Sequence, residues 1–231
     1  MMRIVHILCE GPTEERFVAK VLKPYLSERD ILAKPILLSF NEEKNVGGGV
    51  SKYSKIKEDL ILMFHSYATK DGEFEKHYYT TMLDLFRLPA DVPGNDKSLS
   101  NQALLTSVEI AFEDDISRII PRGRFIPYIQ YHEFEALVFC GIDALKSEYP
   151  KANKSIEELK AILLEFNNQP ENINSRLDKA PSKRLISSFL KQRVRYDKVR
   201  CGVLATSSVG VDKLRELCPH FDEWIGKLEK L

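Results

Sequence analysis

The hydrophobic pattern of the first 140 residues alternates between short apolar runs and stretches with helical periodicity. Residues 3–9 read Arg-Ile-Val-His-Ile-Leu-Cys, a nearly continuous apolar run that is typical of a strand buried on both faces of a parallel sheet. A polar turn follows, in which Thr13 is a plausible N-cap, and apolar residues then recur at helical spacing from Phe17 to Tyr25. The chain is therefore predicted to begin with a strand, a loop and a helix.

The same pattern predicts three further strands separated by helices. Strands are expected at 35–40, 77–85 and 124–131, and helices at 53–67 and 104–116. The order β-α-β-α-β-α-β predicts an α/β fold, in which helices flank a mostly parallel sheet.

Two segments of this region are predicted to be irregular, and the rest of the chain to be helical. Three consecutive glycines make 45–50 a loop that could approach a ligand, while two prolines and a glycine interrupt 87–100. We therefore expect an α/β core at 1–140 and a helical C-terminal subdomain packed on it at 141–231. The helices of this subdomain are predicted at 156–166, 182–190, 211–217 and 221–231.

Composition narrows the class of protein. The 231 residues are 43% hydrophobic, which is enough for a buried core, and 34 basic residues balance 34 acidic ones. Any contact with nucleic acid must therefore come from a local basic patch. The four cysteines form no C-x-x-C pair, which favours reduced thiols over disulfides or a zinc site. With neither a signal peptide nor an apolar stretch of membrane-spanning length, the sequence predicts a cytoplasmic protein.

Acidic residues follow three of the predicted strands. Glu10 and Glu14 come after the first strand, Asp84 closes the third, and Glu133 and Glu135 follow the fourth. The carboxyl ends of parallel strands share one edge of a sheet, so we expect these side chains to converge there. Clustered carboxylates repel each other and are usually gathered around a hard cation such as Mg²⁺ or Mn²⁺. Such an ion can activate water and neutralise charge on a phosphate.

Most of these residues also have a purely structural interpretation. Glu14 could complement a helix dipole, Asp84 could be a turn residue, and Glu133 could be an ordinary acid at a helix start. His132 is more often a packed core histidine than a ligand. Glu10, held between a buried strand and Gly-Pro, is the hardest to explain in this way.

A basic segment at 175–200 carries nine lysines and arginines against two aspartates. Pro181 and Ser182 predict a helix start, where backbone N–H groups together with Lys183 and Arg184 could hold a phosphate. The alternative is a solvated charged face. Tyr196 could stack on a base or be structural.

Several motifs together indicate a family resemblance. The run Glu-Gly-Pro-Thr-Glu at 10–14, with Asp84 closing a later strand, resembles the Toprim superfamily, which includes nucleases of the overcoming-lysogenization-defect type. More closely, the chain resembles an uncharacterised bacterial and archaeal family of the Toprim-like clan. The blocks that carry this resemblance are Cys-Glu-Gly-Pro-Thr-Glu at 9–14, Leu83-Asp84 with Leu88-Pro89, Pro-Tyr-Ile-Gln-Tyr-His-Glu-Phe-Glu-Ala-Leu at 127–137, Ala-Pro-Ser-Lys-Arg at 180–184, and Cys-Pro-His-Phe at 218–221 with Trp224.

The resemblance implies a Toprim/Rossmann-like sheet, acid–base work by Glu10 and Mg²⁺ binding by Asp84. The second aspartate of the superfamily's Asp-x-Asp motif is replaced by Phe86, so Glu133 or Glu135 would have to supply another ligand. The leading hypothesis is a Mg²⁺- or Mn²⁺-dependent nuclease. Its catalytic residues would be Glu10 and Glu14, and its substrate contacts Thr13, His132, Ser182, Lys183 and Arg184.

The resemblance also implies a partner, because related nucleases often work with an ATPase in phage defence or repair. The chain itself contains no P-loop motif, so ATP chemistry would belong to that partner. Two alternatives stay open. One is a non-catalytic Toprim-like subunit that binds a protein or nucleic acid, and the other is phosphoryl transfer on a small nucleotide.

Overall fold

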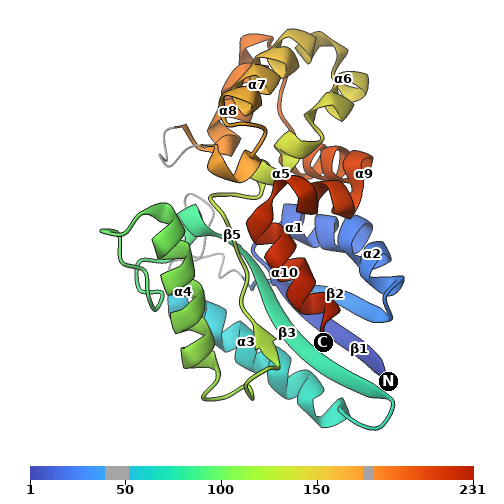
Figure 1. The fold of residues 1–231 in the computed structure, drawn as a ribbon, viewed down its shortest axis with the longest axis vertical. Helices are drawn as coiled ribbons and strands as arrows, with labels where there is room; N and C mark the ends of the chain where they lie inside the picture. Colours follow the sequence, from blue (N-terminus) through green and yellow to red (C-terminus); the bar gives the residue numbers. More distant parts are fainter. Residues whose placement is uncertain (40–51, 174–178) are drawn as a thin grey trace.

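Residues 1–39, 52–173 and 179–231 are described by the computed structural model shown in Figure 1. Their strands form one sheet in the order β2-β1-β3-β4, with β5 also paired to β3, and every one of these pairs is parallel. The strands are β1 (Met2–Cys9), β2 (Ile31–Leu37), β3 (Glu75–Asp84), β4 (Phe125–Ile126) and β5 (Ile129–Gln130). The predicted α/β fold with a parallel sheet is confirmed.

Helices cover both faces of the sheet because β1 sends apolar side chains to each side. Val5 and Ile7 point to one core and Leu8 to the other, as the two-residue period of a strand requires. The first core is covered by α1 (Pro12–Phe17), α2 (Lys23–Ser27), α9 (Lys198–Leu217) and α10 (Pro219–Glu229). The second is covered by α3 (Tyr53–Tyr67) and α4 (Asn101–Ile116).

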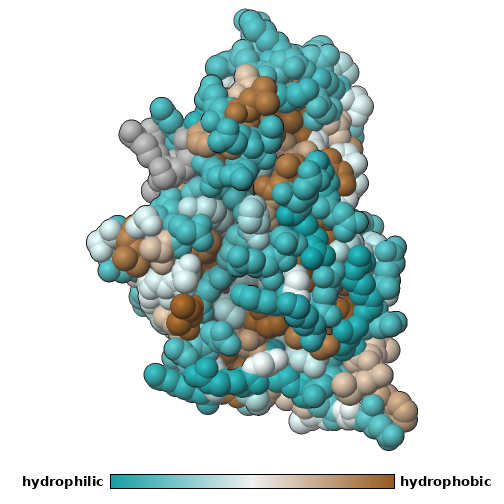
Figure 2. Space-filling model, viewed as in Figure 1, coloured by the Kyte–Doolittle hydropathy of each residue, from teal (hydrophilic) through white to brown (hydrophobic). Residues whose placement is uncertain are grey.

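The remaining helices lie beyond the carboxyl ends of the strands, in the upper part of Figure 1. They are α5 (Glu135–Cys140), α6 (Leu145–Glu148), α7 (Asn153–Glu165) and α8 (Pro181–Lys191). Short 3-10 turns occupy Ala68–Lys70, Leu85–Arg87, Ile142–Ala144, Pro150–Ala152 and Pro170–Asn172. None of the helices described combines the length and the apolar character that crossing a membrane requires. The face seen in Figure 2 is mostly hydrophilic, with apolar side chains in scattered patches.

After α8 the chain returns to the sheet through α9 and α10. Trp224 of α10 is buried, and its indole Nε1 donates a hydrogen bond of 2.9 Å to Thr80 Oγ1 in β3. Arg3 of β1 donates to the backbone carbonyl of Leu231 at 3.0 Å. Helices from the second half of the sequence therefore complete the core that β1 begins.

The helix predicted from Phe17 to Tyr25 contains a π-helical turn at Val18–Leu22 between α1 and α2. The N–H of Lys23 donates to the carbonyl of Val18, five residues earlier. Pro24 follows, and a proline inside a helix supplies no N–H and crowds the preceding turn. The wider turn accommodates that proline, which the hydrophobic period alone could not indicate.

Two predicted strands differ from those observed. The strand expected at 35–40 begins earlier, at Ile31, and ends at Leu37; its Pro35 is tolerated because β2 lies at the sheet edge. The strand expected at 124–131 is split into β4 and β5 because Pro127 has no N–H. Between them Thr81 Oγ1 takes over the pairing, accepting from Tyr128 N–H at 3.1 Å and donating to its carbonyl at 2.9 Å.

The predicted helix at 53–67 is confirmed as α3, and the glycine loop at 45–50 lies outside the described residues. The helix expected at 211–217 is only the end of α9, which starts at Lys198 and kinks at Gly210, where φ is 73°. Asp197 caps α9 by accepting from the N–H of Arg200 at 3.0 Å. The helical period of hydrophobic residues did not indicate the first part of α9, because glycine and polar residues interrupt its apolar face.

Candidate active site

Five carboxylates meet at the carboxyl edge of the sheet. Each is between 3% and 8% exposed, although acidic side chains are rarely buried without a partner. Burial raises the pKa of Asp84 well above its usual range, and the charges of the other four carboxylates raise it further. The structure therefore brings together all the acids that the sequence singled out, namely Glu10, Glu14, Asp84, Glu133 and Glu135.

Backbone hydrogen bonds fix the two central carboxylates. Glu10 Oε2 accepts from the N–H of Asp84 at 2.8 Å, which ties the end of β1 to the end of β3. Asp84 Oδ1 accepts from the N–H of Phe134 at 2.8 Å, which ties β3 to the start of α5. The N–H of Phe86 donates to the carbonyl of His132 at 3.1 Å and strengthens the same junction. These hydrogen bonds hold the ends of β1 and β3 and the start of α5 together around Glu10 and Asp84.

Glu14 owes its position to Gly11. The predicted N-cap role of Thr13 is wrong: Gly11 is the N-cap of α1, with extended backbone and no side-chain hydrogen bond. A Cβ atom at Gly11 would lie 3.2 Å from Glu14 Oε2, so glycine leaves room for this carboxylate beside the helix start. Burial raises the pKa of Glu14 to about 7, with further contributions from Glu10 and Glu135, against hydrogen bonds from nearby backbone N–H groups. Glu14 can therefore change protonation near neutral pH.

Among the residues that the structure describes, two cations face the cluster. The Nε atom of Arg87 lies 3.8 Å from Glu10 Oε1 and 3.9 Å from Asp84 Oδ2. Lys198 at the start of α9 approaches Glu135 Oε1 to 2.6 Å. Burial still raises the pKa of Glu10, despite the opposing effects of the Asp84 N–H and the Arg87 charge. The carboxylates therefore outnumber the cations that face them.

Sequence reasoning assigned no site role to Arg87 or Lys198. Arg87 was part of a segment predicted to be irregular, and Lys198 one of many residues in the basic segment. For Arg87, the sequence signal was its position three residues after Asp84. The turn Leu85–Arg87 brings the Arg87 side chain back to Asp84. Lys198 offered no such signal, because its contact depends on how α9 packs.

The donor set suits a hard divalent cation. Glu10 and Asp84 each use one oxygen to accept a backbone N–H and turn the other toward Arg87. Among the described residues, no three histidine, cysteine, aspartate or glutamate side chains are arranged to hold a metal ion as they stand. Mg²⁺ commonly takes one or two protein carboxylates and completes its shell with water and substrate phosphates. The two oxygens that face Arg87 fit that pattern.

His132 and Glu133 lie at the turn that connects β5 to α5. His132 adopts a positive φ of 63°, which is uncommon for a residue with a side chain, and Glu133 Oε2 accepts from the N–H of Ser182 at 3.0 Å. The His132 ring is buried beside Phe86, and its Nε2 lies 3.2 Å from Asn101 Nδ2. Burial lowers the pKa of His132 to about 4, so the ring is neutral at physiological pH. Ser182 thus supports the cluster through its backbone, and His132 is packed in the core.

The other predicted substrate contacts have different surroundings. Lys183 is exposed, while Arg184 donates to the carbonyl of Lys179 at 3.1 Å and lies over the Phe166 ring. Thr13 packs toward α9, where its methyl group would contact a Cβ placed at Gly202.

The basic segment is largely engaged in structural contacts. Tyr196 is buried against Phe189, which supports its structural interpretation. Lys191 pairs with Glu158, and Arg200 with Glu148. Arg176, also counted in this segment, lies outside the described residues.

The fold and the cluster define an α/β protein with buried carboxylates at the carboxyl edge of a parallel sheet. The chain belongs to the family described as domain of unknown function (DUF4276), which it matches over residues 9–229. No curated protein and no solved structure matches it.

Proposed function

We propose that this protein is a phosphodiester hydrolase that acts on nucleic acid and depends on Mg²⁺ or Mn²⁺. The observation that carries the proposal is the group of five buried carboxylates at the ends of the strands, with Arg87 facing two of them. Collecting so many acids costs free energy, because burial and mutual repulsion both oppose ionisation. A bound cation would offset that cost. The resemblance of residues 10–14 and Asp84 to Toprim nucleases supports nucleic acid as the substrate and leaves room for a partner ATPase.

Each residue of the cluster has a distinct role in this proposal. Glu10 and Asp84 would hold the ion through the oxygens that now face Arg87. Glu135 is the better of the two candidates for a third ligand, because a flexible lysine holds it, whereas a backbone N–H holds Glu133. When bound, the ion would neutralise charge on a phosphate and make a water molecule more acidic.

Proton transfer would fall to Glu14. With a pKa of about 7 it is close to the value at which a general acid–base catalyst works best at neutral pH. Arg87, released from Glu10 and Asp84 once an ion neutralises them, would be able to contact a phosphate oxygen of the substrate. The other predicted substrate contacts would shape the surroundings of the cluster or bind more distant parts of the substrate. They are Thr13, His132, Ser182, Lys183 and Arg184.

Calorimetric titration with Mg²⁺ and Mn²⁺ tests the proposal directly. Wild type should bind at least one ion, and Asp84→Asn should lose that binding while keeping its fold. Cleavage of labelled DNA and RNA strands should then require the ion and be lost in both Glu10→Gln and Asp84→Asn. A wild-type protein that binds neither ion, even with an oligonucleotide present, would refute the hydrolase.

A non-catalytic binding subunit is the second candidate, and two observations favour it. Phe86 stands where the superfamily has its second metal-binding aspartate, and Arg87 already provides a positive charge beside the two central acids. This alternative predicts nucleic-acid or protein binding that survives Glu10→Gln and Asp84→Asn, with no cleavage by wild type.

A further inference from the structure

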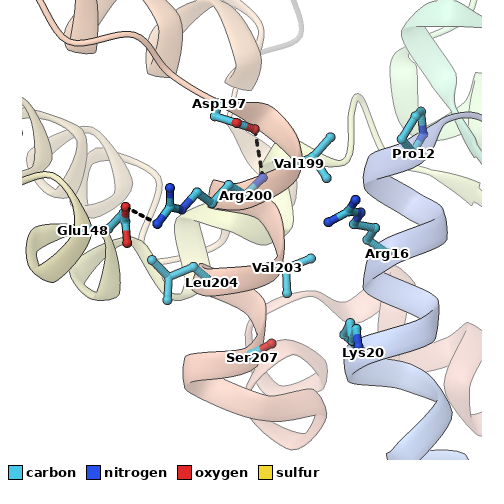
Figure 3. Close-up of a pocket in the computed structure, with 10 residues that line it drawn as sticks. All are labelled: Pro12, Arg16, Lys20, Glu148, Asp197, Val199, Arg200, Val203, Leu204 and Ser207. Atoms are coloured by element: carbon cyan, nitrogen blue, oxygen red, sulfur yellow. Dashed lines mark hydrogen bonds and ion pairs between the residues drawn. The ribbon is translucent and has the colours of Figure 1, made fainter.

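A groove of about 940 Å³ runs between the first helical segment and α9 (Figure 3). Its apolar lining comes from α9: Val199 and Val203 extend toward the first helical segment, and Leu204 lies on the side of Glu148. Arg16 and Lys20 form the opposite wall, from α1 and the π-helical turn. The groove therefore combines an apolar base with one cationic wall.

The charges in the groove leave two cations available. Arg200 is held by Glu148 at 2.6 Å, and its N–H by Asp197, as the dashed lines in Figure 3 show. Arg16 and Lys20 have no ion pair with any residue in the described parts of the chain, and both are exposed. They lie one helical turn apart, and in Figure 3 the Arg16 side chain extends toward α9. Two neighbouring unpaired cations suit a ligand that carries successive negative charges.

At one end of the groove, two lining residues are neighbours, in the sequence, of residues that belong to the carboxylate cluster or contact it. Pro12 lines this end and follows Glu10 by two residues. Across the groove Asp197 lines it, and the next residue, Lys198, contacts Glu135 of the cluster at 2.6 Å. A chain of phosphates lying along Lys20 and Arg16 would therefore lead toward the proposed site of cleavage.

We propose that this groove binds the sugar–phosphate backbone of a single-stranded nucleic acid and guides it to the carboxylates; this inference rests on the proposed function. Arg16 and Lys20 would contact successive phosphates, while the valine and leucine side chains would pack against sugars and bases. A rigid duplex would not enter a groove of this size between two adjacent helices, whereas a flexible single strand would. The assignment moves the principal backbone contacts away from Lys183 and Arg184, which sequence reasoning had favoured.

Fluorescence anisotropy with a labelled single strand, at several salt concentrations and without divalent ions, tests the groove separately from catalysis. Each phosphate contact on a single strand contributes about 0.7 to the slope of log K against log salt. Arg16→Gln/Lys20→Gln should therefore bind at least tenfold more weakly and with a slope shallower by about 1.4. The matched control is Lys151→Gln/Lys154→Gln, which removes two exposed lysines near the start of α7 and should bind like wild type.

The possible outcomes separate the two proposals. Wild-type binding with the same affinity and slope in Arg16→Gln/Lys20→Gln would overturn the groove and leave the hydrolase standing. An equal loss in the lysine control would also overturn it, because the effect would then reflect net charge alone. A duplex that binds as tightly as the single strand would overturn the strand preference. Absence of binding to any strand by wild type would overturn the groove and the nucleic-acid substrate together.

A second variant tests the apolar lining of the groove. Val203→Glu places a carboxylate between Arg16 and the strand, so it should weaken binding at least as much as the double variant. Unchanged binding by Val203→Glu would show that the strand does not lie in this groove.

Discussion

The backbone N–H of Asp84 donates a hydrogen bond of 2.8 Å to Glu10 Oε2, and this bond joins the ends of two adjacent strands. Glu10 is therefore part of the framework that holds the ends of β1 and β3 together. A variant that removes its charge can be separated from one that removes its hydrogen-bond acceptor, because glutamine keeps an oxygen at the same position.

We predict that Glu10→Gln is at least as stable as wild type at pH 8, whereas Glu10→Ala loses about 1–3 kcal/mol of unfolding free energy. The alanine variant leaves the buried N–H of Asp84 without its acceptor, while the glutamine variant also relieves repulsion among the carboxylates. Urea denaturation measures the unfolding free energy of both variants. Equal stability of the two variants would show that the Glu10–Asp84 bond contributes little.

The raised pKa of Glu14 predicts a stability that falls with increasing pH. Its ordinary pKa of 4.5 becomes about 7 in the folded protein, so between these values the folded state keeps a proton that the unfolded chain has lost. The free energy of unfolding should therefore decrease as pH rises from about 4.5 to 7, by an amount on the order of 3 kcal/mol. Glu14→Gln should remove its own part of this decrease and leave the part that comes from the raised pKa values of Glu10 and Asp84. The stability of the variant relative to wild type should therefore be greater at pH 8 than at pH 5. Glu15→Gln, one residue along and only partly buried, is the control and should leave the decrease in place.

The same proton should compete with a divalent cation. The negative charge of ionised Glu14 acts together with that of Glu10 to favour a bound cation. Affinity for Mg²⁺ or Mn²⁺ should therefore weaken as pH falls through about 7 and Glu14 takes up its proton. Calorimetry at pH 6 and pH 8 should show this difference in wild type and a smaller one in Glu14→Gln. An affinity that does not change with pH would place the ion away from Glu14.

Arg87 is predicted to act as a substitute for the cation. Arg87→Gln removes the positive charge nearest Glu10 and Asp84, which should cost about 1 kcal/mol, or about 2–4 °C in Tm, without divalent ions. Millimolar Mg²⁺ should raise the Tm of this variant by more than it raises that of wild type. Arg118→Gln is the matched control, because Arg118 also pairs with an aspartate at 3.8 Å but lies on the surface. If Mg²⁺ stabilised Arg87→Gln no better than wild type, the ion and the arginine would not share a position.

Trp224 is predicted to be essential to the core. Trp224→Ala should cost about 3–5 kcal/mol, and Trp224→Phe about 1–2 kcal/mol through the lost hydrogen bond to Thr80. A chain of residues 1–140 should show no cooperative unfolding, because α9 and α10 cover one face of its sheet. Leu164→Ala, at a position that is 64% exposed, should leave stability nearly unchanged. Cooperative unfolding of the 1–140 chain would show that the core is independent of these helices.

Much of the fold could be predicted because its elements are specified by local pattern. The buried run in β1 and the regular period of α3 need no tertiary information, and Glu10 and Asp84 follow from where their strands end. The split between β4 and β5 depended on Thr81, a side chain in another strand that bonds to Tyr128 in place of the backbone. No pattern within 124–131 contains that contact.

The acids of the candidate site were easier to predict than its cations. Carboxylates at strand ends have a fixed place in a parallel sheet, whereas Arg16, Lys20 and Lys198 sit on helices whose neighbours are set by packing. Sequence reasoning weighted the dense basic segment near Lys183, but density along the chain does not show which way side chains point. The structure turns Arg184 toward Phe166 and leaves Arg16 facing the groove.

The packing of α9 and α10 on the sheet also bears on how the protein is made. Strand β1 leaves the ribosome long before these helices. The apolar face formed by Val5 and Ile7 therefore stays exposed to water until α9 and α10 can pack on it. Glu135 likewise cannot form its ion pair until Lys198 has been synthesised. The first core and the Lys198–Glu135 contact are therefore completed late, only after α9 and α10 have been synthesised.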